Sequence, residues 1–177
     1  MKLSVKHNAE ILVGDYQFAD KVKEQVISLL DEGVPSLPHT TNVNASVHTI
    51  WNWEPDNITF RNLKGFIREE IERNFKPGVM WGGSRSWLRM GNFWGNVYEK
   101  GDYADSHDHK PNAFSFAYFV KSKWYYPSLV FTDSGKRIRP KEGRFVAFPS
   151  YLMHHVPKHR YNGTRITLSG NLVINRE

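Results

Sequence analysis

From residue 87 onward the chain is a series of short runs rich in β-branched and aromatic residues, separated by Gly, Pro and Asp-Ser-Gly turn signals. Runs of this kind predict strands. The predicted strands are 87–98, 113–120, 129–132, 136–139, 144–148 and 164–174. The sequence Asp133-Ser134-Gly135 predicts a hairpin turn between the third and fourth of them. Many short strands at close spacing favour a β-sandwich or a jelly roll.

Two amphipathic helical patterns precede these strands. Apolar residues recur at helical spacing over 16–32, where Gly33 supplies the stop, and over 59–75, where Pro77 does so. The segment 34–46 between them is rich in Pro, Thr and Asn, which predicts a loop that could serve as a lid. Helices followed by strands indicate an α+β fold rather than an alternating α/β one.

We therefore predict a single domain over residues 1–177. Its core is expected to be a double-stranded β-helix, or jelly roll, over about 79–177. The helices of about 1–78 are expected to pack against one of its sheets. A chain of 177 residues with 40% hydrophobic residues is long enough to bury such a core.

Composition excludes several classes of site and of location. The chain has no cysteine, so disulfides, thiolate metal sites and cysteine nucleophiles are ruled out. No apolar run has the length of a signal-peptide core or of a membrane span, which predicts a cytoplasmic protein. The net charge is +6, and its richest basic run is 136–144, which we interpret as solvated surface charge. A nucleic-acid partner is thus only weakly supported, because the aromatic residues near that run, Phe145 and Phe148, have the pattern of core residues.

Three histidines form a candidate metal site. His107 and His109 are two residues apart, so on an extended segment their imidazoles lie on the same face. His154 follows 45 residues later, directly after an apolar strand, and could complete a three-point site. Imidazole binds Fe(II), Zn, Ni and Cu alike, and three ligands on one face leave positions open for other molecules.

The last predicted strand offers a cation close to that site. Arg165, Thr167, Ser169 and Asn171 fall on one face of this strand, and the other face is apolar. We interpret the polar face as the wall of an internal pocket rather than a solvated surface. An arginine there can hold a carboxylate through a charge-assisted pair of hydrogen bonds. A metal with a carboxylate anchor beside it predicts an oxygenase that consumes a 2-oxo acid.

These motifs, in this order and spacing, resemble the Fe(II)/2-oxoglutarate-dependent dioxygenases, and most of all the small prolyl-4-hydroxylase-like branch of bacteria and phages. The residues that carry the resemblance are Tyr98-x-x-Gly101-x5-His107-x-His109, then Gly143 to Val156 around Phe148-Pro149 and His154, then Arg165 to Asn171. The resemblance implies that His107 and His154 bind the metal and that Arg165 binds the co-substrate. It also implies co-substrate contacts from Tyr98, Thr167 and Asn171.

His109 stands where the family pattern has Asp. A close branch of the family carries His-x-His as well, so the resemblance implies a three-histidine site at this position. Without an anionic protein ligand, affinity for Fe(II) should fall relative to Zn, Ni or Cu. Asp105 lies two residues before His107, so on an extended segment its side chain falls on the same face as both histidines. It could support the site or, alternatively, complete it as a ligand. Asp108 should point to the opposite face.

The leading hypothesis is an enzyme that uses Fe(II), 2-oxoglutarate and O2 to hydroxylate an unidentified substrate, with release of succinate and CO2. That substrate could be a prolyl or other protein side chain, a small molecule or a nucleobase. The tryptophans of 51–53 and 81–87 could frame the substrate entrance. Two alternatives stay open: a cupin-type metalloenzyme that does not use 2-oxoglutarate, and a degenerate, non-catalytic binding module on the same fold.

Overall fold

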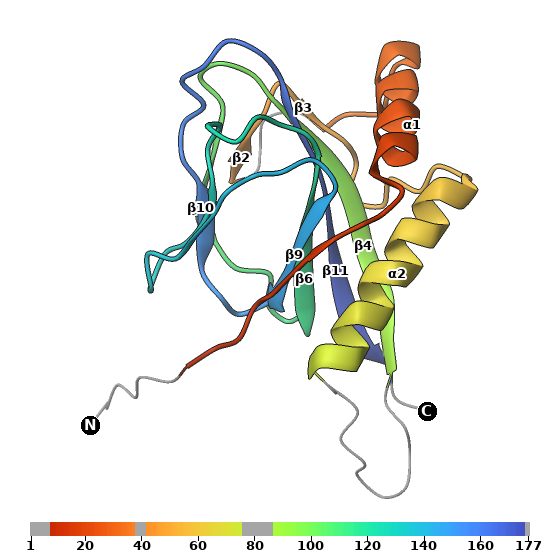
Figure 1. The fold of residues 1–177 in the computed structure, drawn as a ribbon, viewed down its shortest axis with the longest axis vertical. Coiled ribbons are helices and arrows are strands. Elements are labelled where there is room, and N and C mark those ends of the chain that lie inside the picture. The colour runs from red at the N-terminus through yellow and green to blue at the C-terminus, as the bar shows by residue number, and fades with distance from the viewer. Residues whose placement is uncertain (1–7, 38–41, 76–86, 176–177) are drawn as a thin grey trace, which may run out of the picture.

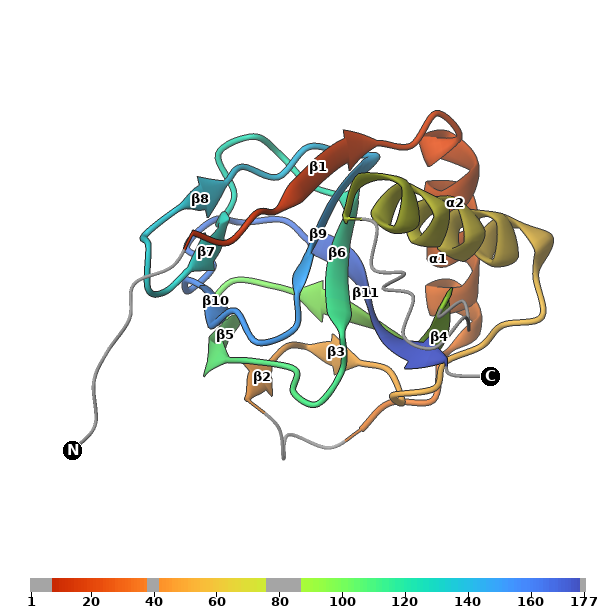
Figure 2. The same cartoon turned by 90° about the horizontal axis from the view of Figure 1, so that it is seen from below.

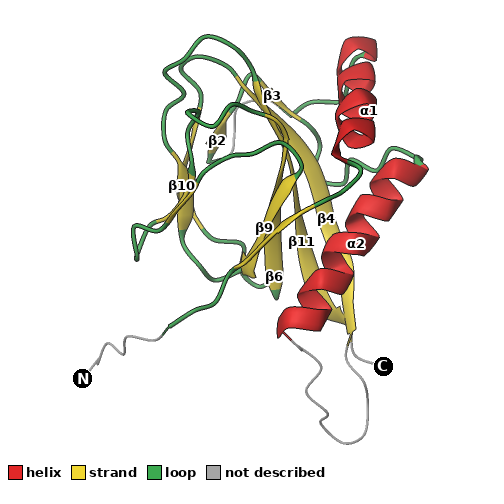
Figure 3. Cartoon of the chain, in the orientation of Figure 1, coloured by secondary structure: helices red, strands yellow, loops and turns green. Residues whose placement is uncertain are grey.

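The described part of the chain forms two β-sheets that face each other, with two helices covering the outer side of the larger sheet (Figure 1). The computed structural model describes residues 8–37, 42–75 and 87–175. Figure 2, seen from below, places both helices on the same side of the molecule. Figure 3 shows the smaller sheet, with β10, on the side away from the helices. The predicted α+β class, with a jelly-roll core and helices against one sheet, is confirmed.

The strands pair antiparallel throughout both sheets. The larger sheet has the order β1 (Leu12–Asp15), β9 (Arg144–Pro149), β6 (Phe114–Lys121), β11 (Arg165–Asn175), β4 (Trp87–Tyr98), β3 (Val47–His48). The smaller sheet has the order β2 (Val43–Asn44), β5 (Tyr103–His107), β10 (His154–Val156), β7 (Leu129–Phe131), β8 (Arg137–Ile138). The helices are α1 (Ala19–Glu32) and α2 (Ile58–Phe75).

One part of the core lies between α2 and the larger sheet. The helix keeps four fully buried residues at helical spacing: Phe60, Leu63, Ile67 and Ile71. They pack in one cluster with Ile166, Leu168 and Leu172, the apolar face predicted for β11. Burying the four helix side chains contributes roughly 6–12 kcal/mol as an upper estimate, at about 1.5–3 kcal/mol each.

A second part of the core lies between the two sheets. Strand β9 shows how one strand serves both parts, because its side chains alternate between them. Phe145 and Ala147 join the cluster beneath the helices, whereas Val146 and Phe148 join the cluster between the sheets. A strand buried on both faces is apolar at nearly every position, as β9 is.

The predicted elements match the structure to within three residues at each end. The turn at Asp133-Ser134-Gly135 joins β7 to β8, with Gly135 at a φ of +67°, a left-handed conformation that favours glycine. Strands β1, β2, β3, β5 and β10 are not among the predicted strands. Strands β7 and β8 are equally short, but the turn signal between them made them predictable. Within the segment 34–46, β2 occupies part and residues 38–41 lie outside the described residues.

Neither helix in the described ranges has the length and apolar character needed to span a membrane.

Candidate metal centre and anion pocket

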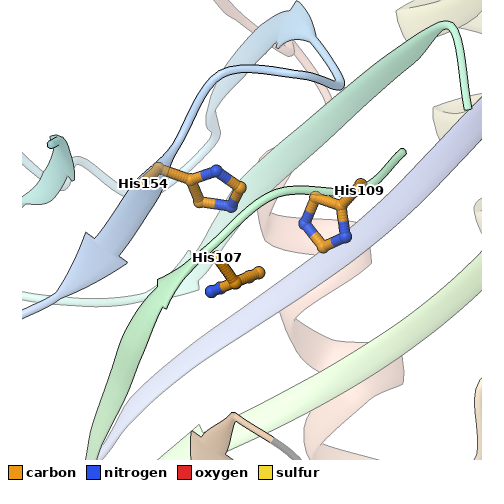
Figure 4. A group of neighbouring side chains, drawn as sticks. All are labelled: His107, His109 and His154. Atoms are coloured by element: carbon orange, nitrogen blue, oxygen red, sulfur yellow. The ribbon is translucent and has the colours of Figure 1, made fainter. Parts of the chain in front are cut away.

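The three histidines converge at the edge of the space between the sheets (Figure 4). His107 is the last residue of β5 and His154 is the first of β10, and the two are paired across the strands. His109 lies in the loop that follows β5, where its backbone N–H donates to the carbonyl of Ser150 at 2.8 Å. The ring centroids are 4.4 to 5.0 Å apart, and one ligand atom from each residue lies within 4.8 Å of the others.

Backbone carbonyls orient two of the rings. The Nδ1 of His107 is 2.6 Å from the carbonyl oxygen of Asp105, and the Nδ1 of His154 is 2.8 Å from that of Leu152. A carbonyl can only accept a hydrogen bond, so each Nδ1 carries the proton and each Nε2 keeps a free lone pair. In metal-binding histidines, a hydrogen bond from the ring nitrogen that does not bind the metal fixes the tautomer in this way.

Burial keeps the imidazoles neutral. Desolvation, reinforced by the neighbouring histidines, lowers the pKa of His109 to about 3 and that of His154 to about 4. Desolvation also lowers the pKa of His107. Imidazole binds a metal cation in its neutral form, so all three rings are in the protonation state that metal binding needs.

A bulge in β5 explains the position of Asp105. His107 pairs with His154 and Ala104 pairs with Val156, so three steps along β5 correspond to two along β10. Because of this extra residue, Ala104 and His107 both point inward, while the Asp105 side chain is exposed. Its carboxylate does not belong to the histidine group, and its backbone carbonyl orients His107. Asp108 forms an ion pair with Lys110 at 2.8 Å, outside that group.

Arg165 is buried without a partner for most of its polar atoms. The residue is 2% exposed, and its guanidinium carbon lies 4.9 Å from the ring centre of Tyr98 and 5.4 Å from that of Phe119. Tyr98 is its cross-strand partner on β4. Among the residues that the structure describes, the Nε and Nη1 atoms of Arg165 have no hydrogen-bond partner. Burial lowers the pKa of the guanidinium, and the neighbouring Tyr98 hydroxyl opposes this shift. An unpaired cation is costly to bury, so this position suits an anionic ligand.

The histidines and Arg165 line one pocket between the two sheets. Tyr98 of β4 lines it as well, and so does Thr167 from the predicted polar face of β11. Sequence reasoning missed Asn96, which is 3% exposed and lines the pocket. Its Oδ1 has no hydrogen-bond partner within the described part of the chain. The signal was available, because Asn96 lies two residues before Tyr98 on the same strand face.

Asn171 occupies a different place from Thr167. It is buried but does not line the pocket, and its Oδ1 accepts a hydrogen bond from the Ser115 hydroxyl at 2.8 Å. That hydroxyl is 2.7 Å from the hydroxyl of Ser150, whose carbonyl accepts from the N–H of His109. Asn171 is therefore linked to the loop that carries the third histidine, and a direct co-substrate contact stays a prediction.

The tryptophans divide between core and pocket wall. Trp53 is buried in the cluster beneath the helices. Trp51 is 37% exposed and meets Trp94 edge to face at 4.9 Å, and Trp94 lines the pocket 5.7 Å from the ring of His109. Trp87 is 41% exposed, and Trp81 lies outside the described residues. Their role at a substrate entrance stays a prediction.

Residues 130–171 match a protein family described as "Putative 2OG-Fe(II) oxygenase". This segment includes His154, Arg165, Thr167 and Asn171, but it does not reach His107 or His109. No curated protein sequence matches the chain.

Solved structures share the fold at low sequence identity. A prolyl-4-hydroxylase from Pseudomonas putida aligns with a TM-score of 0.70 and 14% identity, covering 93% of this chain and 92% of that one. A viral collagen prolyl hydroxylase from Paramecium bursaria Chlorella virus-1, in complex with 2OG, aligns with a TM-score of 0.66 and 14% identity, covering 92% and 94%. HygX from Streptomyces hygroscopicus, with nickel, 2-oxoglutarate and hygromycin B bound, aligns with a TM-score of 0.65 and 11% identity, covering 93% and 83%. The resemblance predicted from the sequence is confirmed: the chain has the fold of these oxygenases, and its segment 130–171 has the sequence pattern of a 2OG-Fe(II) oxygenase family.

Proposed function

We propose that this protein is an Fe(II)- and 2-oxoglutarate-dependent oxygenase. One observation carries the proposal: three neutral imidazoles and a buried guanidinium with unpartnered N–H groups line the same pocket. The donor set fits the metal, because imidazole nitrogens suit Fe(II) and three protein ligands leave positions for a bidentate co-substrate and O2. The unpaired cation fits the far carboxylate of a 2-oxo dicarboxylic acid.

In this proposal His107, His109 and His154 hold the metal ion. When bound, Fe(II) would supply the dioxygen chemistry that converts 2-oxoglutarate to succinate and CO2 and hydroxylates the substrate. Arg165 would pair with the carboxylate far from the metal, with Tyr98 and Thr167 beside it in the pocket wall. Their role is to orient the co-substrate in a pocket whose lining residues are mostly buried.

Arg165 also argues for this function over a cupin-type enzyme without a 2-oxo acid. A buried arginine is normally paired, since an unpaired one leaves several donors without water or protein partners. Here two of its nitrogens lack partners among the described residues. A dicarboxylate co-substrate would satisfy them, whereas a metal site alone gives this residue no role.

For the substrate we propose a prolyl or other protein side chain, or a small molecule. The support comes from the structurally similar proteins: two are prolyl hydroxylases, and a third has hygromycin B bound together with 2-oxoglutarate. Trp94 and the exposed edge of Trp51 are the side chains we expect beside such a substrate.

An anaerobic titration tests the proposal. Fe(II) and 2-oxoglutarate are added in turn to wild type, His154→Ala and His155→Ala, while the metal-to-ligand absorption band and the melting temperature are followed. His155 is the matched control, because it adjoins His154 but its Nδ1 contacts the Thr132 hydroxyl at 3.1 Å. We expect the band and a raised melting temperature in wild type and His155→Ala, and neither in His154→Ala.

Other outcomes would select the alternatives. Metal binding without any effect of 2-oxoglutarate would favour a cupin-type metalloenzyme. If wild type binds no divalent metal more tightly than the His154→Ala variant does, the chain is a non-catalytic module. Succinate formation under air, in the presence of candidate substrates, then tests turnover.

A further inference from the structure

Two loops bring exposed aromatic rings together on the outside of the molecule. Trp124 and Tyr125 lie between β6 and β7, and Tyr161 lies between β10 and β11. These three residues, here called the aromatic platform, are 71%, 37% and 44% exposed, respectively. Large aromatic side chains usually bury most of their surface, so three exposed together mark a surface for a partner.

Packing between the loops fixes the platform. The rings of Tyr125 and Tyr161 meet edge to face at 5.0 Å, and Trp124 meets Tyr125 in the same way at 5.7 Å. Beneath them the buried Tyr126 stacks on Tyr161 with an interplanar angle of 24°, and its hydroxyl donates to the carbonyl of Asn162 at 3.3 Å. The rings are thus ordered before any partner binds, which lowers the entropy cost of binding.

Exposed cations are interleaved with these rings. Lys123 precedes Trp124, with its Nζ 5.9 Å from the ring centre of Tyr125. Lys158 and Arg160 precede Tyr161 on the other loop, and both are exposed. None of these three cations forms an ion pair with a residue that the structure describes. The surface is therefore positively charged, on a chain with a net charge of +6.

We propose that the aromatic platform and its three cations bind single-stranded nucleic acid. Exposed rings offer faces on which unpaired bases stack, and the cations beside them attract the phosphates of the strand. A duplex keeps its base faces covered, so it could use only the cations. A proline-rich peptide could use the rings but not the cations.

This surface is separate from the candidate metal centre. None of the six residues that form or support it lines the pocket: Lys123, Trp124, Tyr125, Lys158, Arg160 and Tyr161. It nevertheless adjoins the start of β11, because its second loop leads directly into Arg165. The nucleic-acid site is thus a binding function beyond the proposed oxygenase, and it is testable on the metal-free protein.

Fluorescence anisotropy with labelled 12-mers of deoxythymidine and of uridine tests the proposal at 50 mM salt. We expect Trp124→Ala to weaken binding by about tenfold, within the range for loss of one base–aromatic stack. The triple variant Lys123→Ala, Lys158→Ala, Arg160→Ala should flatten the salt dependence. For three phosphate contacts, wild-type affinity should fall about 20-fold between 50 and 200 mM salt.

The matched control is the pair Phe18→Ala and Lys21→Ala at the start of α1, which belongs to neither loop of the platform. There Lys21 lies 5.5 Å from the ring of Phe18, which is 47% exposed, in a cation–ring pair like that of Lys123 and Tyr125. This pair should leave binding unchanged. The proposal is overturned if abasic strands or duplexes bind as tightly as the 12-mers, if Trp124→Ala has no effect, or if only a proline-rich peptide binds. Because Trp124 is mostly solvent-exposed, its loss should not impair folding, which circular dichroism verifies.

Discussion

Arg165→Ala is the most informative substitution in the candidate site. Wild-type Arg165 is 2% exposed, and its guanidinium carbon lies 4.9 Å from the ring centre of Tyr98 and 5.4 Å from that of Phe119. Two of its nitrogens have no hydrogen-bond partner among the described residues. In a protein where this arginine served only stability, its donors would be paired. Here we expect its removal to affect co-substrate binding far more than folding.

The magnitudes follow from this environment. Leaving a ligand carboxylate buried without its cation costs about 2–4 kcal/mol, which corresponds to about 30- to 900-fold weaker binding of 2-oxoglutarate. For folding, two effects oppose each other. Truncation loses the packing against Tyr98 and Phe119, but it also removes an unpaired buried charge. We therefore expect the unfolding free energy of the metal-free protein to change by less than about 2 kcal/mol.

Calorimetric titration of 2-oxoglutarate and of 2-oxobutyrate, anaerobically with metal bound, separates these effects. 2-Oxobutyrate lacks the second carboxylate, so wild type should prefer 2-oxoglutarate strongly and Arg165→Ala should not. Arg144→Ala is the control, because that arginine already pairs with Asp15 at 3.2 Å. The reasoning is refuted if Arg165→Ala binds 2-oxoglutarate within threefold of wild type, or if it keeps the wild-type preference between the two acids.

Three further predictions concern the histidines. First, burial holds the pKa of His109 and His154 at about 3 and about 4, below the value of 6.5 in the unfolded chain, so unfolding takes up protons and stability falls as the pH falls below 6.5. Lowering the pH from 7.5 to 5 should reduce the unfolding free energy of the metal-free protein by about 2 kcal/mol for each of these two histidines, as measured by denaturant unfolding. His154→Ala should make this reduction smaller. Second, His109→Asp adds an anionic oxygen ligand and should raise Fe(II) affinity relative to Zn(II) in competition titrations; an unchanged ratio would mean that His109 does not bind the ion. Third, Asn171→Ala should weaken metal binding while changing 2-oxoglutarate affinity less than threefold, because Asn171 reaches the His109 loop through Ser115 and does not line the pocket; a larger effect on 2-oxoglutarate would restore it as a co-substrate contact.

Periodicity made the long elements predictable. Strand β11 alternates between polar and apolar residues over most of its length, and α2 keeps a regular apolar stripe, so both were expected with the correct faces. Strands β3 and β10 lack a turn signal like the one between β7 and β8, and they are strands because segments far away in the sequence pair with them. The extent of the single domain stays a prediction.

The site itself was partly predictable for the same reason. His107 and His109 are two residues apart, and so are Arg165 and Thr167, which places each pair on one face of its segment. The structure brings both pairs together in one pocket. Asp105 was expected on that face too, but the bulge in β5 is a tertiary feature that reverses the parity within the strand. Asn96 was overlooked because no charge or ring distinguished it from other strand residues.

The histidines and Arg165 belong to opposite layers of the fold. His107 and His154 are paired within the smaller sheet, whereas Arg165 and Tyr98 are paired within the larger one. A dicarboxylate bound to both would therefore act as a cross-brace between the two layers, in addition to the side-chain packing between them. Amide hydrogen exchange should then slow in both β10 and β11 when metal and dicarboxylate are added together. Metal added alone should slow exchange in these strands far less.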